Sequence, residues 1–255
     1  MFNTFINTWW GILIIYAVSF LVWTFISALL YRVFFKRFYD LVLSGIALVV
    51  LSPIFIILII LGAIKMKGNP FFTQLRPGKN GKIFRLIKFR TMTMEKDTDG
   101  NFLPDDKRLT KYGKALRATS LDELPELINI FIGNMSIVGP RPQLVRDMVF
   151  MSDEVKKRHI VRGGLTGLAQ VNGRNNITWE EKFIYDLEYV KKITLFGDLK
   201  IIFGTVFKVL KGSDVSRNGM ETDIDYGDWL LKTDKIGLEE YQSKLNEAKE
   251  LCRGK

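Results

Sequence analysis

Two adjacent carboxylates, Asp122 and Glu123, are the residues whose types and spacing best suit chemistry. They lie in the stretch RATSLDELPELINI, between Arg117 and a segment with helical apolar periodicity. Pro125 has no backbone N–H and suits the first turn of that helix, so both acids fall at its N-terminus. Free N–H groups and the helix dipole favour anions such as phosphate there. Such a pair could supply a nucleophile that attacks phosphorus and a ligand for a metal ion.

The same acids also suit a purely structural role. Ser120 and Glu123 match the S-x-x-E capping-box pattern, and acids commonly stabilise helix N-termini. The single histidine, His159, excludes a histidine-rich zinc site, and the single cysteine, Cys252, excludes an intrachain disulfide. Any metal ion must therefore be held mostly by oxygen ligands, which favours Mg²⁺ or a similar hard cation.

Basic residues near these acids are candidates for binding phosphate. Arg141 stands between two prolines in IVGPRP, where a fixed backbone suits bidentate phosphate binding, although a rigid turn with a surface arginine is the alternative. Lys88 and Arg90 in IKFRTM are two residues apart and share one face of a strand. Arg174 lies in the glycine-rich stretch GLTGLAQVNGRN, which matches neither the P-loop nor the G-x-G-x-x-G pattern.

The elements that must position these residues follow from periodicity and turn chemistry. We expect a strand–turn–strand unit over residues 71–92, helices over 107–118, 124–133, 179–193, 197–212 and 237–250, and a short strand within 135–142. A short helix followed by a glycine-rich loop is expected over 153–175, and an extended acidic segment over 213–235.

The N-terminal residues predict a membrane helix. Residues 1–31 contain no charged side chain, and residues 9–31 are long enough to cross a bilayer about once. Trp9, Trp10 and Tyr31 stand at the two ends of this stretch, as in an interfacial aromatic belt. A cleaved signal peptide fits less well, because a basic n-region is missing and the apolar run is too long.

A second apolar stretch, residues 41–64, is interrupted at its midpoint by Ser52-Pro53. Proline favours a kink, and the serine hydroxyl can satisfy a freed carbonyl. Each half is 12 residues, too short to span alone, so the chain could enter the membrane and return on the same face. Basic residues flank both ends of the stretch: Arg32, Lys36 and Arg37 before it, Lys65 and Lys67 after it. This charge pattern favours re-entry over a kinked spanning helix, because cytoplasmic flanks are the basic ones.

The net charge of +10 suits an anionic partner such as a lipid headgroup, nucleic acid or phosphorylated substrate. Positive flanking of membrane segments explains the same surplus. A non-catalytic membrane tether that binds nucleic acid or anionic lipid is therefore one alternative to an enzyme. A transferase that moves a lipid-linked phosphate group without a sugar is another.

Four features in order, the Ser-Pro-broken apolar segment, KFRTM, TSLDELPELINIFIGNMSIVGPRP and GLTGLAQVNGRN, resemble the bacterial sugar transferases. These are the monotopic polyprenyl-phosphate phosphoglycosyl transferases, and the chain looks most similar to their small catalytic-core members. The resemblance covers about residues 33–215. Residues 1–31 have no counterpart in the smallest members, and their role stays open.

The resemblance implies transfer of sugar-1-phosphate from a UDP-sugar to undecaprenyl phosphate, with release of UMP. It assigns Asp122 as the nucleophile that forms a phosphosugar intermediate and Glu123 as the ligand of Mg²⁺. The residues that it places around the substrates are Lys88, Arg117, Arg141, Arg174 and Asp198, to which we add Arg90 from the strand of Lys88. The product would begin a capsule, exopolysaccharide, O-antigen or glycoprotein glycan, whereas the sugar and the oligomeric state stay open.

The expected fold is a mostly helical α/β (α+β) membrane-associated domain with a small sheet. We divide the chain into a transmembrane segment (1–35), a re-entrant membrane helix (36–66), a catalytic domain (67–215) and a C-terminal extension (216–255). The catalytic domain is expected on the cytoplasmic face of the bacterial inner membrane, with no nucleic-acid partner.

Overall fold

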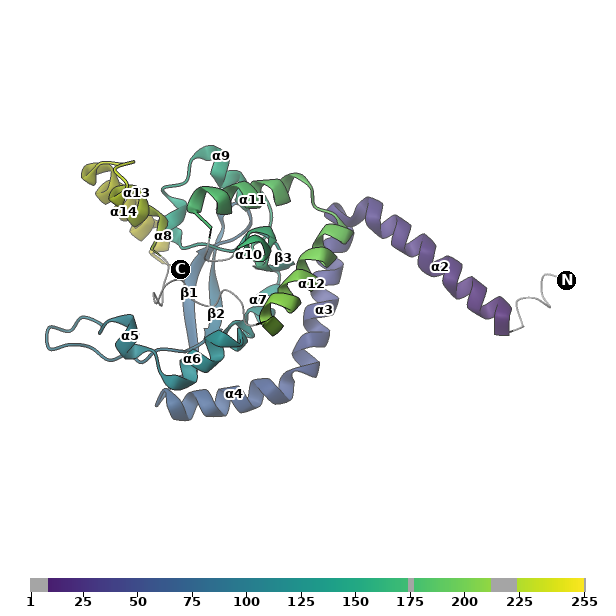
Figure 1. Ribbon diagram of the computed structural model, residues 1–255, viewed down its shortest axis with the longest axis horizontal. Coiled ribbons are helices and arrows are strands. Elements are labelled where there is room, and N and C mark those ends of the chain that lie inside the picture. Colours follow the sequence, from purple (N-terminus) through teal and green to yellow (C-terminus); the bar gives the residue numbers. More distant parts are fainter. Residues whose placement is uncertain (1–8, 174–176, 212–223, 255) are drawn as a thin grey trace.

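The computed structural model describes residues 9–173, 177–211 and 224–254. Its first element is helix α2 (Trp9–Leu30), which extends away from the rest of the molecule (Figure 1). Its most apolar window, residues 9–26, has a mean hydropathy of 2.0, and 6% of that window is buried. Within the described residues, α2 is the one unbroken helix long and apolar enough to cross a membrane. This agrees with the predicted N-terminal membrane helix.

The second apolar stretch forms two helices that meet at the predicted break. After a short π-helical turn, η1 (Tyr31–Phe35), come α3 (Lys36–Val50) and α4 (Ser52–Lys65). The helical run from Tyr31 and α4 are bent by 64° relative to one another. The Ser52 hydroxyl donates a hydrogen bond to the Val49 carbonyl at 2.7 Å, so it satisfies an acceptor at the bend, as the sequence predicts.

Both helices are attached to the globular body that follows. On α3, Asp40 accepts a hydrogen bond from the Ile137 backbone N–H at 2.9 Å. On α4, the Leu58 carbonyl accepts one from the Tyr112 hydroxyl at 3.1 Å, and Phe55 packs on Phe89 with ring centroids 5.7 Å apart. The two arms of the bent helix therefore hold the same body.

The predicted strand–turn–strand unit is confirmed. Strand β1 (Phe71–Pro77) pairs antiparallel with β2 (Ile83–Phe89) through the turn η2 (Lys79–Gly81). Asn80 and Gly81 have φ angles of 57° and 73°, the left-handed conformation that these two residue types tolerate best.

The predicted short strand, β3 (Ser136–Val138), is also confirmed, but its partner was not expected. It pairs in parallel with β4 (Gly164–Thr166), and helix α10 (Leu168–Asn172) follows. The prediction of a continuous glycine-rich loop here is therefore wrong. The glycines permit strand pairing, because a Cβ on Gly164 would lie 2.1 Å from the Gly139 nitrogen. The expected small sheet is thus two separate two-stranded sheets.

Helices make up most of the remaining described chain. They are α5 (Asp105–Arg108), α6 (Lys111–Ala118), η3 (Leu121–Glu123), α7 (Glu126–Phe131), α8 (Val145–Met148), α9 (Asp153–Lys156), η4 (Lys157–Ile160), α11 (Trp179–Lys191) and α12 (Leu195–Lys211). The helix expected over residues 107–118 is interrupted, because Leu109 bridges to Met92 and Thr110 caps α6 through the Gly113 N–H. The fold is mostly helical with small sheets, as expected.

The C-terminal part contains α13 (Tyr226–Lys232) and α14 (Leu238–Cys252). The polar helix α14 was predicted, whereas α13 falls in the segment expected to be extended. Tertiary packing accounts for α13, since Tyr226 contacts both Trp179 and Phe183 in the body with ring centroids 5.3 and 5.0 Å apart. Residues 213–223 of that expected segment lie outside the described residues.

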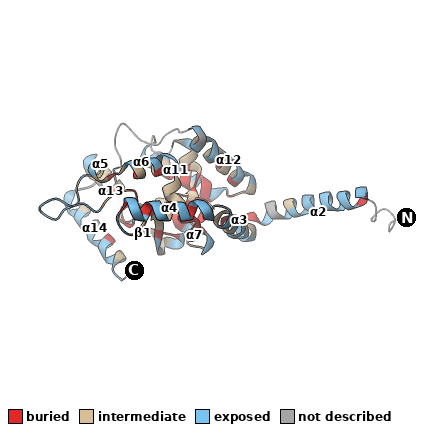
Figure 2. Ribbon diagram, turned by 90° about the horizontal axis from the view of Figure 1, so that it is seen from below, coloured by how far each residue is buried: buried red, intermediate tan, exposed pale blue. Residues whose placement is uncertain are grey.

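Buried residues concentrate in the body, while α2 is largely exposed (Figure 2). The largest core cluster joins α4, β2, α6 and α7, with Phe89, Leu116 and Ile130 among its members. A second cluster joins Tyr31 of η1 to Val138, and a third includes Trp179 and Phe183 of α11. The first cluster fixes α7, and hence the acid pair that precedes it.

Candidate active site

Asp122 and Glu123 lie on the 3₁₀ turn η3, immediately before α7. Ser120 precedes the turn with φ 56°, and its side chain makes no capping hydrogen bond. The capping-box interpretation is therefore wrong, and the Glu123 side chain binds other residues.

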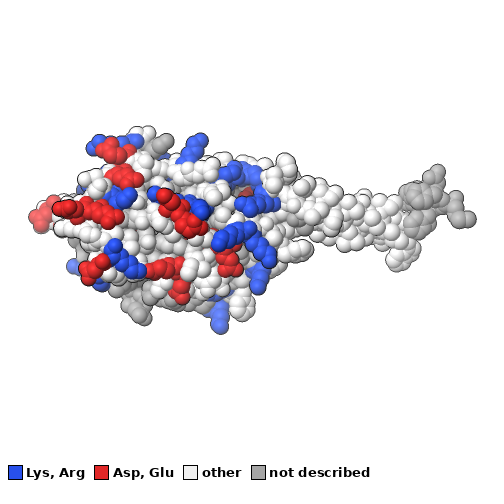
Figure 3. Space-filling view, turned by 90° about the horizontal axis from the view of Figure 1, so that it is seen from above, with Lys and Arg blue, Asp and Glu red and all other residues white. Residues whose placement is uncertain are grey.

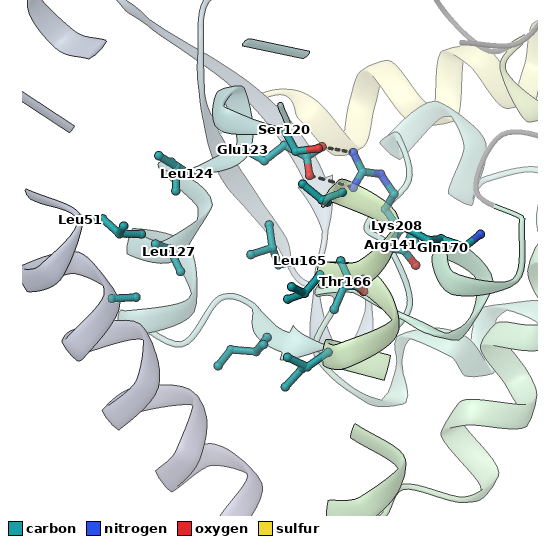
Figure 4. Close-up of a pocket in the computed structure, with 16 residues that line it drawn as sticks. Leu51, Ser120, Glu123, Leu124, Leu127, Arg141, Leu165, Thr166, Gln170 and Lys208 are labelled. Carbon is teal, nitrogen blue, oxygen red and sulfur yellow. Dashed lines mark hydrogen bonds and ion pairs between the residues drawn. The ribbon is translucent and has the colours of Figure 1, made fainter. Parts of the chain in front are cut away.

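Glu123 is held by two cations from distant parts of the chain. Lys88 Nζ lies 2.8 Å and Arg141 Nη2 lies 2.5 Å from the same oxygen, Glu123 Oε1. Figure 4 shows the pairing of Glu123 with Arg141. Lys88 also lies 3.1 Å from Glu126 Oε1. Burial alone would raise the pKa of Glu123, but Arg141 and Lys88 outweigh it and hold that pKa well below its usual range. The structure thus brings together the predicted residues Lys88, Glu123 and Arg141.

The pKa of Asp122 is shifted in the opposite direction. Burial and the neighbouring Glu123 charge raise the pKa of Asp122 above its ordinary value, although Lys88, Arg117 and Arg141 counteract them. Arg117 donates from Nε to the Thr91 hydroxyl at 3.2 Å. The two adjacent acids therefore differ in character, with Glu123 permanently ionised and Asp122 more basic than an ordinary aspartate.

A fully buried ion pair fixes the backbone at Arg141. Arg158, which is 1% exposed, donates to the Arg141 carbonyl at 2.7 Å and pairs with Asp186 at 2.6 Å. Sequence reasoning missed both residues. Arg158 follows two lysines in a polar run, which gives no signal of burial, and Asp186 lies on an amphipathic helix with several other acids.

An apolar cavity of about 350 Å³ reaches from the bend between α3 and α4 to this cluster. Figure 4 shows Leu51, Leu124, Leu127 and Leu165 on its walls, with Glu123 and Arg141 paired at one end. Residues of α12, including Lys208, complete the lining. The cavity therefore suits a ligand with an apolar body and an anionic end.

A second cavity of about 340 Å³ adjoins the first and is far more polar. Arg141 and Gln170 line both cavities. Arg141 therefore stands where an apolar space and a polar space meet.

The other predicted site residues lie in different places. Asp198 is buried on α12, where it accepts hydrogen bonds from the Tyr31 and Tyr189 hydroxyls at 2.7 and 2.9 Å and pairs with Lys36 at 2.5 Å. This network ties α12 to the membrane-side helices. Arg90 follows the end of β2, and its backbone N–H donates to Pro70.

Arg174, which was also predicted for the site, lies outside the described residues. The roles of all these residues stay predictions. Within residues 9–173, 177–211 and 224–254, no group of three or more His, Cys, Asp or Glu side chains is arranged to hold a metal ion. Mg²⁺, however, commonly uses one or two carboxylates together with substrate phosphates and water. Glu123 Oε1 is already engaged by Lys88 and Arg141, so a Mg²⁺ ion there would bind through the other oxygen or replace one of these cations, and the assignment of Glu123 to Mg²⁺ stays a prediction.

Comparison with known proteins identifies the family of this chain. A family model described as bacterial sugar transferase matches residues 31–212. The uncharacterized sugar transferase EpsL of Bacillus subtilis is 45% identical over 73% of this chain and 93% of its own. The UDP-glucose:undecaprenyl-phosphate glucose-1-phosphate transferase of Klebsiella pneumoniae is 42% identical over 68% of this chain but only 40% of its own. An Escherichia coli protein of the same name is 39% identical, over 39% of its length. The chain is therefore a transferase and belongs to the bacterial sugar transferase family.

Proposed function

We propose that this protein transfers sugar-1-phosphate from a UDP-sugar to undecaprenyl phosphate and releases UMP. The Klebsiella and Escherichia relatives are named for a reaction of this kind with glucose. The observation that carries the proposal is the meeting of an apolar and a polar cavity at Arg141, beside two acids of different basicity. A lipid acceptor and a soluble donor need such a pair of spaces.

Asp122 acts as the nucleophile in this proposal. One of its oxygens attacks the phosphorus that carries the sugar, the bond to the bridging oxygen breaks, and UMP leaves with that oxygen. A phosphate oxygen of undecaprenyl phosphate then attacks the same phosphorus, breaks its bond to Asp122 and restores the carboxylate. The raised pKa of Asp122 supports this role, because a more basic carboxylate is a stronger nucleophile once it is ionised.

The cations around Glu123 would stabilise the charge that gathers on the diphosphate. Lys88 and Arg141 are already oriented by the carboxylate between them, so they need no reorganisation when substrate binds. Arg158 holds the backbone of Arg141 in place by donating a hydrogen bond to its carbonyl. A Mg²⁺ ion held by Glu123 and the diphosphate would add neutralising charge and keep the phosphate oxygens in place.

The apolar cavity would take the part of the lipid next to its phosphate. Leu51 at the helix bend and Leu127 on α7 supply apolar walls, and Arg141 and Lys208 supply positive charge for the phosphate. The rest of a polyprenyl chain would continue past the bend into the bilayer.

The contacts of α3 and α4 with one body support the proposal that the pair is re-entrant. Arg37, near the start of α3, donates to the carbonyls of Ile130 and Phe131 at 2.6 and 2.8 Å. Near the end of α4, a Cβ on Gly62 would lie 3.4 Å from the hydroxyl of Tyr112 on α6. A bilayer core about 30 Å thick would separate these ends if the pair spanned it.

Surface charge supports a cytoplasmic body. Figure 3 shows Lys and Arg gathered where the uncharged N-terminal extension meets the body. Arg32, Lys36 and Arg37 lie at this junction, and they line a cleft together with Lys79 and Arg162. Positive charge beside a membrane helix is typical of the cytoplasmic side.

Release of UMP tests the proposal. The purified full-length protein is incubated with undecaprenyl phosphate, Mg²⁺ and a panel of UDP-sugars. We expect Asp122→Asn to abolish UMP release, because the amide retains the shape but cannot attack phosphorus. Asp99→Asn, at an exposed loop position, is the matched control and should retain wild-type activity. Full activity of Asp122→Asn would contradict the covalent route, and no UMP release by the wild type with any UDP-sugar would contradict the function.

A further inference from the structure

The wall of the polar cavity includes residues from beyond the family match. Ile224 and Asp225 line this cavity, together with Arg76, Asp147 and other residues of the body. The match to the family model ends at residue 212. The cavity next to the reaction centre is therefore completed by a part of the chain that the family model does not describe.

Specific hydrogen bonds and an ion pair attach this segment to the body. Asp225 pairs with Arg146 at 2.9 Å, and the Tyr226 backbone N–H donates to Asp147 Oδ1 at 2.8 Å. The indole Nε1 of Trp179 donates to the Ile224 carbonyl at 3.2 Å. Each of these contacts touches a cavity-lining residue or its neighbour, so they hold the wall in a defined position.

Helices α13 and α14 strengthen the attachment of this segment to the body. Arg146 also pairs with Asp228 at 2.8 Å, and Tyr241 donates a hydrogen bond to Asp228. The Tyr241 ring stacks on Phe150 at 5.6 Å. Arg146 is thus shared by Asp225, which lines the cavity, and Asp228, which is not among the lining residues.

The polar groups of the cavity suit a ligand that carries hydroxyls. Asp225 contributes a partly exposed carboxylate, and carboxylates accept hydrogen bonds from hydroxyl groups. Asp147 and Asp186 line the same cavity but are buried and already bonded, to backbone N–H groups and to Arg158 respectively. Burial and the neighbouring Asp225 raise the pKa of Asp147 to about 6. Gln170 has both amide atoms buried without a hydrogen-bond partner among the described residues. An amide left in this state costs free energy that a bound polar ligand would recover.

The position of Arg141 relates this cavity to the diphosphate. Arg141 lines the polar cavity and pairs with Glu123 at the mouth of the apolar one. A diphosphate bound at Arg141 therefore has the lipid space on one side and the carboxylate-lined space on the other. Trp179 adds an apolar aromatic surface to the second space, which suits packing against a ring.

We propose that the polar cavity binds the hydroxyl-bearing ring attached to the donor's diphosphate, and that Asp225 of the C-terminal segment helps to select it. The ring is either the ribose of the nucleotide or the transferred sugar, which share this chemistry. The inference rests on the proposed function, because the donor is identified by it. Asp225 acts here as a specificity residue and takes no part in the bond-making steps.

Two isosteric variants of the full-length protein test this inference. Asp225→Asn and Asp228→Asn each remove one carboxylate partner of Arg146, but only the first alters the cavity lining. The measurements are KM and kcat for UDP-glucose and UDP-galactose, and the Kd of UMP by titration calorimetry. We expect Asp225→Asn to raise KM at least fivefold with kcat within twofold of wild type. Asp228→Asn should stay within twofold on every measurement.

The UMP titration distinguishes the two rings. If Asp225→Asn weakens UMP binding at least fivefold, the ring is the ribose. If UMP binding is unchanged while KM rises for one or both UDP-sugars, the ring is the sugar. Values within twofold of wild type for Asp225→Asn on every measurement would overturn the inference, as would equal losses in Asp225→Asn and Asp228→Asn.

Failure of the inference differs from failure of the proposed function. A wild-type protein that releases UMP while Asp225→Asn behaves like wild type overturns the inference alone. A wild-type protein that releases no UMP contradicts the proposed function and removes the premise of the inference. Where the wild type is active, the Asp228→Asn control reports whether docking of the C-terminal helices matters by itself.

Discussion

The buried pair of Arg158 and Asp186 gives a prediction whose magnitude follows from the structure. Their side chains are 1% and 3% exposed, and Asp186 Oδ2 accepts from Arg158 Nε and Nη2 at 2.9 and 2.6 Å. Replacement of Asp186 by Asn keeps the shape but leaves the guanidinium charge uncompensated. Loss of one partner of a buried pair costs about 3–5 kcal/mol. A chain of this size loses about 2–4 °C of melting temperature per kcal/mol, so we expect Tm to fall by roughly 6–20 °C.

Thermal unfolding in detergent, followed by circular dichroism, measures this change. Arg158→Met combined with Asp186→Leu removes both charges, and we expect it to recover most of the lost stability, because an apolar pair of similar volume is often no worse than a buried ion pair. The double variant still lacks the bond from Arg158 to the Arg141 carbonyl, so its KM for a UDP-sugar should remain raised. A fall in Tm below about 2 °C for Asp186→Asn would refute the reasoning, as would a double variant with less stability than the single one.

Two further predictions concern pH and membrane topology. Asp122 must be ionised to attack, and its pKa is raised, so activity should fall as pH drops through a value above the ordinary aspartate pKa of about 3.9. A pH profile of kcat/KM with its acid limb at or below about 3.9 would contradict this sign. Cysteines placed at the exposed positions Arg32 and Lys65, in a cysteine-free background, should both react with an impermeant thiol reagent only from the cytoplasmic side. Labelling of the two from opposite sides would show that α3 and α4 span the bilayer.

Local features of the sequence predicted much of the fold. The hairpin of β1 and β2 follows from apolar and aromatic residues that flank the turn residues Pro77-Gly78 and Asn80-Gly81, and the helix break follows from Ser52-Pro53. Such signals act through the backbone conformation of a few neighbouring residues, so they can be recognised without the fold. The same holds for the acid pair, since its place before α7 depends only on the proline and the apolar periodicity behind it.

Other features could not be predicted because they depend on contacts between distant segments. Strand β4 forms where Gly164 packs closely against Gly139 of another segment, and α13 forms where Tyr226 packs against aromatic residues of the body. Arg158 is buried by its partners, although its place at the end of the charged run Lys156-Lys157-Arg158 gives no indication of that burial.

The sequence by itself thus determined the class of chemistry, an acid pair among cations beside a membrane segment, because residue type and local spacing carry that information. Only the tertiary structure decided which of the two carboxylates binds the cations and which is the more basic. Lys88 and Arg141, 35 and 18 residues from Glu123, converge on that one carboxylate and leave Asp122 the more basic of the two. Electrostatic interactions depend on distance in space and on burial, and the order of residues along the chain specifies neither.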